Sequence, residues 1–212
     1  MVHCPVMISD PEQKETGRVE AFSDGVFAIA VTLLVLDLKV PHRSGSEDLS
    51  STLLRQWPTF VAFLNSFVTI LIIWINHHNL FNNIKRTDNL FMLSNGLLLL
   101  CTTFLPFPTS LVAEYFGHPD QTAATVLYTG TFLLMACAFN LIWRYASHKH
   151  RLLSRSVTAV QVESINRQYL IGPTFYGLAF VLAFVNVSAS LLLTILLAAF
   201  YAVTASVSRT RS

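Results

Sequence analysis

The feature that most constrains the fold of this chain is an apolar run, residues 26–36, that begins two residues after an acidic one, Asp24. Thr32 is the only polar residue in the run. About 20 residues of this kind cross the hydrocarbon core of a bilayer as a helix. A carboxylate at the mouth of such a helix is costly and is usually functional. The run therefore predicts a first membrane span with a polar end that matters for function.

Composition extends this interpretation to the whole chain. Of its 212 residues, 53% are hydrophobic and 12% are charged, whereas a soluble domain has about 25% charged residues. We expect an all-α integral membrane protein, residues 1–212 forming one domain in a lipid bilayer, with six spans of about 20 residues each. The expected spans are 18–40, 58–81, 90–112, 123–145, 169–185 and 189–206.

The basic residues predict the orientation of these spans. All 14 lysines and arginines except Lys39, Arg43 and Arg55 fall in the N-terminal segment, the second-to-third connector, the fourth-to-fifth connector and the C-terminal tail. With six spans these segments share one side of the membrane, and positively charged loops stay in the cytoplasm. Both termini are therefore expected to be cytoplasmic. The net charge of +2 is too small to suggest a nucleic-acid partner.

Four residues of the first span share one helical face, because their spacings are three and four. They are Ile29, Thr32, Leu33 and Leu36. Such a stripe suits either a seam between helices or a narrow pore, and periodicity alone favours the seam. Two observations favour the pore: six spans leave little room for an aqueous path inside one subunit, and Gly25, Ala28 and Ala30 permit close approach between helices.

The second span bears a polar stripe that cannot face lipid. It comprises Asn65, Thr69, Asn76, Asn79 and Asn83. One interpretation is interhelical hydrogen bonding that fixes packing; the other is a network of Asp24, Arg18, His77 and Asn76 that holds the first helix. Asp24 either anchors that helix or attracts ions or protons. The adjacent His77 and His78 point about 100° apart on a helix, so no metal site is expected.

Two motifs resemble those of a known family. The run from Arg18 to Leu36, which contains Phe22-Ser23-Asp24, is similar to the first-helix signature of the bacterial transmembrane-protein-175 potassium channels. The run Trp74-Ile75-Asn76-His77-His78-Asn79-Leu80-Phe81 is similar to the second recurrent element of that family. The resemblance implies a homotetramer of six-span subunits, with a central pore lined by the first helix of each subunit.

The resemblance also implies roles for residues. Ile29, Leu33 and Leu36 would form rings that constrict the pore, and Thr32 would be the polar layer linked to potassium preference. A structural network would hold the first helix in place. Its expected members are Arg18, Phe22, Ser23, Asp24, Trp74, Asn76 and His77.

The function implied is passive, modestly potassium-selective conduction in a bacterial inner membrane. K⁺ and other monovalent cations would be the permeant ions, with no cofactor and no bound metal. The alternative is a proton-coupled secondary transporter with Asp24 and His77 as the relay. The sequence contains no Gly-x-Ser-x-Gly elbow, no His-Glu-x-x-His and no Gly-rich phosphate loop. An enzyme with catalytic residues is therefore not expected.

Overall fold

The computed structural model describes residues 11–40 and 48–208, with side chains for 16–40 and 48–203. Within these ranges the regular structure is helical, apart from one isolated bridge between Ile84 and Leu153. The elements in chain order are α1 (Pro11–Leu33), η1 (Leu34–Asp37), α2 (Leu49–Arg55), α3 (Trp57–Asn83), α4 (Asn89–Phe104), α5 (Pro106–Glu114), α6 (Gln121–Ser147), η2 (His148–His150), α7 (Ala159–Ala183) and α8 (Val187–Ser208).

Four stretches among the described residues are long and apolar enough to cross a membrane. They are Thr16–Asp37, Trp57–Asn83, Asn89–Glu114 and Gln121–His150. A further apolar helix, Val187–Val203, is shorter. The helix α7 is long, but polar residues such as Glu163 and Arg167 fill its first half. The chain is thus a multi-pass, all-helical membrane protein.

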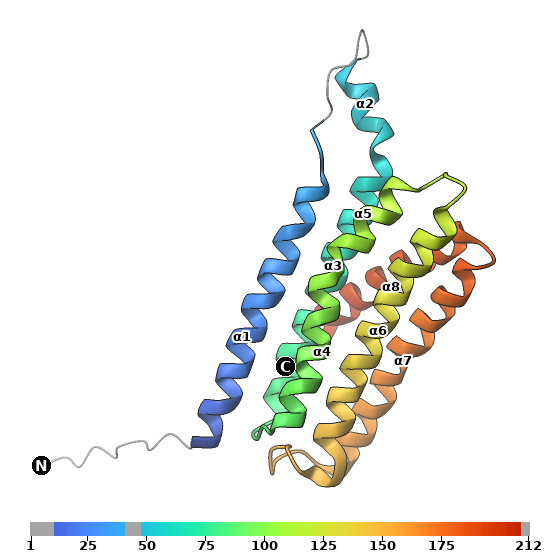
Figure 1. Ribbon diagram of the computed structural model, residues 1–212. Coiled ribbons are helices and arrows are strands. Elements are labelled where there is room, and N and C mark those ends of the chain that lie inside the picture. The colour runs from blue at the N-terminus through green and yellow to red at the C-terminus, as the bar shows by residue number, and fades with distance from the viewer. Residues whose placement is uncertain (1–10, 41–47, 209–212) are drawn as a thin grey trace, which may run out of the picture.

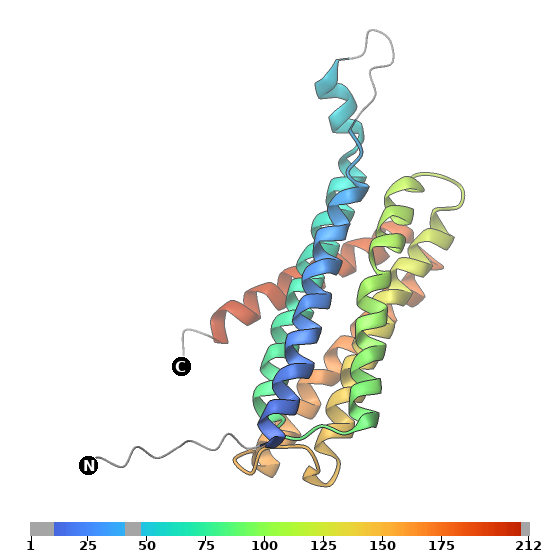
Figure 2. The ribbon, with the colours of Figure 1, turned by 60° about the vertical axis from the view of Figure 1, so that its left-hand side comes forward.

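The long helices form a bundle with α1 at one edge, where it packs on α3 and α4 (Figure 1). The helix α6 lies at the centre and supplies several large side chains that are fully buried, among them Tyr128, Phe132, Met135 and Trp143. The helix α8 runs obliquely to the others and crosses α3 (Figure 2). This arrangement leaves one side of α1 without cover from the other described residues.

Prolines affect two of the helices, one by dividing a predicted span and the other without breaking the helix. The predicted span 90–112 is divided into α4 and α5, which meet at Leu105. Pro106 lacks an N–H group and therefore opens a new helix. In α7, Pro173 cannot donate to the carbonyl of Tyr169, four residues earlier. The side chain of Asn140 on α6 donates to that carbonyl instead, at 3.0 Å, so the helix continues.

The predicted fifth span, 169–185, is the last part of a longer helix that begins at Ala159. A capping box starts this helix: the Gln161 N–H donates to Thr158 Oγ1 at 3.3 Å, and the Thr158 N–H donates to Gln161 Oε1 at 2.8 Å. The cap lies in a polar segment that is predicted from sequence to be a connector between spans. The other predicted spans match α1 with η1, α3, α6 and α8 within a few residues at most ends, but α1 begins seven residues earlier, at Pro11.

The two connectors at the end of the bundle where α1 begins are bonded to each other. The Lys85 N–H donates to the Leu152 carbonyl at 2.9 Å, and the Ser154 N–H donates to the Asn83 carbonyl at 2.8 Å. Asp88 caps α4 there. These bonds tie the α3–α4 connector to the α6–α7 connector.

Candidate functional site

The predicted pore stripe lies on the uncovered face of α1 and η1. The exposed fractions of Ile29, Leu33 and Leu36 are 59%, 39% and 71%, and Thr32 is also exposed. The opposite face is buried against α3, α4 and α5 through Phe27, Ala30 and Leu34. A strongly apolar face without cover must meet lipid or another protein surface.

The helix tightens along this stripe. The α-helix ends at Leu33, and a 3₁₀ turn, η1, continues to Asp37. Side chains three residues apart eclipse in a 3₁₀ turn, so Leu33 and Leu36 lie above one another. The Thr32 hydroxyl donates to the Ile29 carbonyl at 2.9 Å. Its oxygen lone pairs therefore remain available on the exposed face.

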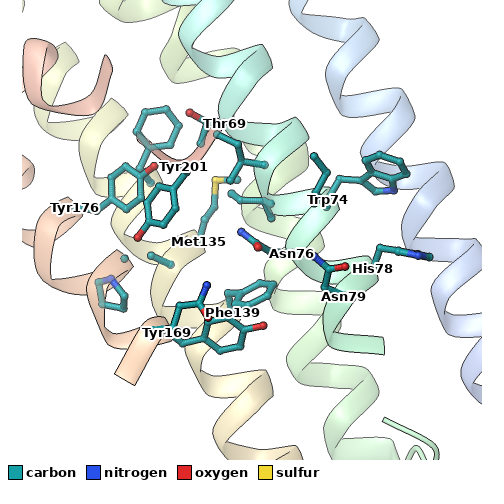
Figure 3. Close-up of a pocket in the computed structure, with 18 residues that line it drawn as sticks. Thr69, Trp74, Asn76, His78, Asn79, Met135, Phe139, Tyr169, Tyr176 and Tyr201 are labelled. Carbon is teal, nitrogen blue, oxygen red and sulfur yellow. The ribbon is translucent and has the colours of Figure 1, made fainter. Parts of the chain in front are cut away.

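Two polar contacts fasten the middle of α1 to α3. Trp74 Nε1 donates to Asp24 Oδ1 at 2.9 Å. One turn nearer the start of α1, His78 Nδ1 lies 2.8 Å from Glu20 Oε1. Glu20 and Asp24 are four residues apart, as are Trp74 and His78, so each pair shares one helical face. Figure 3 shows Trp74 and His78 pointing from α3 toward α1.

A buried chain of hydrogen bonds runs beneath these contacts. Asn95 on α4 donates through Nδ2 to Ser23 Oγ at 2.9 Å, and its Oδ1 lies 2.9 Å from His77 Nε2. The Ser23 hydroxyl donates to the Val19 carbonyl at 2.8 Å. Ser23 and His77 are both 0% exposed, and Phe27 packs edge-on against the His77 ring. One buried network thus joins α1, α3 and α4.

The structure brings four of the seven predicted network residues to this contact: Ser23, Asp24, Trp74 and His77. Phe22 is 68% exposed and points away from it. Arg18 is also exposed, and no hydrogen bond joins it to Asp24 within the described residues. Asn76 lies on the other side of α3, where it lines a cavity against α6 and α7 (Figure 3).

Sequence reasoning missed Asn95, Glu20 and His78 as members of this contact. Asn95 lies beside Ser94 in a largely apolar part of the third span, and Glu20 precedes Asp24 by one helical turn. Both patterns are signals for polar side chains that meet another helix. The described residues contain no group of three His, Cys, Asp or Glu side chains placed to hold a metal ion.

A second buried polar cluster lies nearer the start of α3. Asn65 Nδ2 donates to the Tyr128 hydroxyl at 2.9 Å and lies 3.2 Å from Thr194 Oγ1. The Ser66 hydroxyl lies 2.8 Å from Thr109 Oγ1 and 2.9 Å from the Tyr128 hydroxyl. This cluster joins α3 to α5, α6 and α8. The polar stripe of the second span therefore meets helices other than α1.

Comparison with known proteins gives concordant matches. Residues 18–106 match the family described as "Endosomal/lysosomal potassium channel TMEM175". A potassium channel of Chamaesiphon minutus is 48% identical over 198 residues, which are 92% of this chain and 98% of that one. A potassium channel of Streptomyces collinus is 39% identical over 188 residues, which are 88% and 91% of the two chains.

A solved structure agrees with this. The crystal structure of a lysosomal potassium-selective channel TMEM175 homolog from Chamaesiphon minutus superposes with a TM-score of 0.83. The two chains are 46% identical, and the match covers 91% of this chain and 99% of that one. The range that matches the family, residues 18–106, includes both the uncovered stripe of α1 and the buried network.

Proposed function

Because this chain belongs to the TMEM175 family, we propose that it is a potassium channel that conducts ions passively across a membrane. The observation that carries the proposal is the uncovered face of α1. It is apolar except for the Thr32 hydroxyl, while the opposite face is fixed to the bundle by the buried network. A helix held in this way can present one chosen face to an ion path.

The pore belongs to a homotetramer of six-span subunits. Each subunit contributes the face of α1 and η1 that bears Ile29, Leu33 and Leu36. Four copies around an axis cover that face, which one chain leaves open. In this assembly α7 and α8 are the fifth and sixth spans, and α4 and α5 together make the third.

The constriction consists of apolar rings rather than carbonyl oxygens. A narrow apolar bore expels water, and this closes it to ions. Rings of Ile29, Leu33 and Leu36 therefore gate the pore by dewetting. Thr32 lies between the first two rings and offers four hydroxyl oxygens, which replace part of the hydration shell of K⁺. Because four hydroxyls form a weaker cage than stacked carbonyls, potassium selectivity is modest and other monovalent cations also pass.

The protein lies in the bacterial inner membrane with both termini in the cytoplasm. The bonded connectors support this orientation, because they bring Lys85, Arg86 and Arg151 to the end of the bundle where α1 begins. Positively charged connectors stay on the cytoplasmic side. The whole chain is one channel domain that needs no cofactor.

The test is an ion flux measurement on the full-length protein in phosphatidylcholine liposomes. The vesicles hold a potassium gradient and contain no valinomycin. The protein should then carry a current that grows linearly with the gradient and reverses near the potassium equilibrium potential. Empty liposomes are the control. Saturable uptake that requires a pH gradient would instead favour the proton-coupled transporter with Asp24 and His77, and would overturn the channel assignment.

A further inference from the structure

A cavity of about 380 Å³ lies between α3 and the helices α6 and α7, and its lining extends to Trp74 and His78, which contact α1. It is bounded by residues of α3, α6, α7 and α8, several of which Figure 3 labels, and it is only partly enclosed. Its volume falls in the range of small-molecule sites, about 300–1,000 Å³. None of the residues of the predicted pore stripe, Ile29, Thr32, Leu33 and Leu36, borders it. The cavity is therefore separate from the proposed pore.

The two walls of the cavity differ in chemistry. The helix α6 contributes an apolar and aromatic wall through Phe132, Met135 and Phe139. The helix α3 contributes the amides of Asn76 and Asn79. The lining contains no Lys, Arg, Asp or Glu, and its one histidine, His78, is already paired with Glu20. Since a bare charge inside a membrane protein needs a counter-charge, this site suits an uncharged molecule.

Two polar groups in the cavity have no partner. The Asn76 amide and the Tyr169 hydroxyl form no hydrogen bond within the described part of the chain, although both are partly buried. Tyr169 is held in place by its ring, which packs edge-on against Phe139 and Trp143. A polar group at membrane depth that lacks a hydrogen bond is costly. These groups are therefore positioned to receive a bound molecule.

Close packing of the backbone shapes the cavity. Gly172 precedes Pro173 in α7, and a Cβ at Gly172 would lie 3.6 Å from the Ala136 Cβ and 3.8 Å from the Tyr201 hydroxyl. The helices α6 and α7 thus approach closely at this level, while the cavity remains open beside them. The Asn140 bond to the Tyr169 carbonyl keeps α7 regular at Pro173. The walls therefore rest on fixed helices rather than on loops.

We propose that this cavity binds an uncharged, membrane-soluble amphiphile with one hydroxyl or amide head group and an apolar body. The head group bonds to Asn76 and Tyr169, and the body packs on Phe132, Met135 and Phe139. Such a molecule reaches the site from the bilayer, because the cavity is only partly enclosed. Because α3 forms both this wall and the contact with α1, occupancy restrains the helix that positions the pore face.

The test is photolabelling of the full-length protein in phosphatidylcholine liposomes. The probes are a diazirine-bearing alkylphenol and the matching alkylbenzene that lacks the hydroxyl. The phenol should label peptides of α3, α6 or α7 saturably and with about fivefold preference over the alkylbenzene, the ratio that one hydrogen bond of about 1 kcal/mol gives. Mass spectrometry locates the label, and no conduction is needed for the measurement.

Two variants make the test specific. Ala136→Leu fills the cavity and should abolish labelling, whereas Cys137→Leu, at the exposed neighbouring position, should not. Asn76→Leu keeps the volume and should remove the preference for the phenol. Labelling of the cavity by both probes alike, with no effect of Asn76→Leu, would show a plain apolar groove for lipid tails and overturn the proposal. Absence of saturable labelling in the unmodified protein would do the same.

Discussion

At the scale of single residues, the Thr32 hydroxyl is the only polar group on the apolar face of α1 between Ile29 and Leu36. Thr32→Val keeps the shape of the side chain and removes the oxygen. We expect the permeability ratio of potassium to sodium to fall while the protein still assembles. The measurement is the reversal potential under bi-ionic conditions. Thr174→Val is the matched control, since Thr174 is exposed and donates to its own helix in the same way, at 2.8 Å. An unchanged ratio in Thr32→Val would exclude a role in selectivity.

The hydrogen bond between Trp74 and Asp24 can be tested with an equally small substitution. Trp74→Phe retains an aromatic ring and removes the donor, so Asp24 loses its partner. Because both side chains are partly exposed, the expected loss of stability is about 1 kcal/mol. Thermal unfolding in detergent measures it, beside Trp57→Phe as the control, because Trp57 makes ring contact only. Equal melting temperatures would contradict the anchoring role of the bond, and a change confined to ion preference would place Asp24 in the conduction path instead.

At the scale of elements, the 3₁₀ turn after Leu33 places two leucines in line on the open face. Leu33→Ala should widen the ring that Leu33 forms and ease wetting of the bore, so current rises. Leu141→Ala on α6 is the control, because Leu141 is exposed to a similar degree, 48% against 39% for Leu33. Single-channel recording compares the two. A current that is equal in both variants would remove Leu33 from the constriction.

The elements also show which features can be read from sequence. Apolar length and periodicity suffice to locate most of the long helices, and the exposed stripe on α1 follows from spacings of three and four. The start of α7 escapes this reasoning because its cap, Thr158 with Gln161, lies in polar sequence. Asn76 is two residues from both Trp74 and His78, about 200° around the helix, so it cannot share their face. Asn95 becomes evident only when α4 is docked against α1 and α3.

At the scale of the whole molecule, Asp88 joins three parts of the chain at one end of the bundle. It accepts from the Phe91 N–H at 2.9 Å, from the Tyr145 hydroxyl at 2.7 Å and from Arg151 at 3.1 Å. Partial burial acts to raise the pKa of Asp88, but these bonds and the Arg151 charge outweigh it and lower the pKa. The connectors are therefore held together through an ionised carboxylate.

This lowered pKa has a defined consequence for stability. Its contribution is complete above the ordinary carboxyl pKa of about 3.9 and is lost as the pH falls through the lower pKa of the folded state. We expect the unmodified protein to melt at a higher temperature than Asp88→Asn at pH 6, and the difference to shrink below pH 4. Asp120→Asn, at an exposed site, is the control. A difference that does not change with pH would contradict the role of the ionised Asp88.

The polar contacts that Glu20, Ser23 and Asp24 make with α3 and α4 all lie within about one turn at the middle of α1. Beyond Asp24 the helix meets the bundle through apolar side chains, which attract without fixing direction. Mechanically, the part of the helix after Asp24 is a rod held at this contact. At 1.5 Å per residue, Leu36 lies about 18 Å from Asp24 along the rod. A rotation of about 5° at this contact therefore displaces Leu36 by about 1.6 Å, roughly the size of a methyl group, so small movements of α3 are amplified at the far end of the lever.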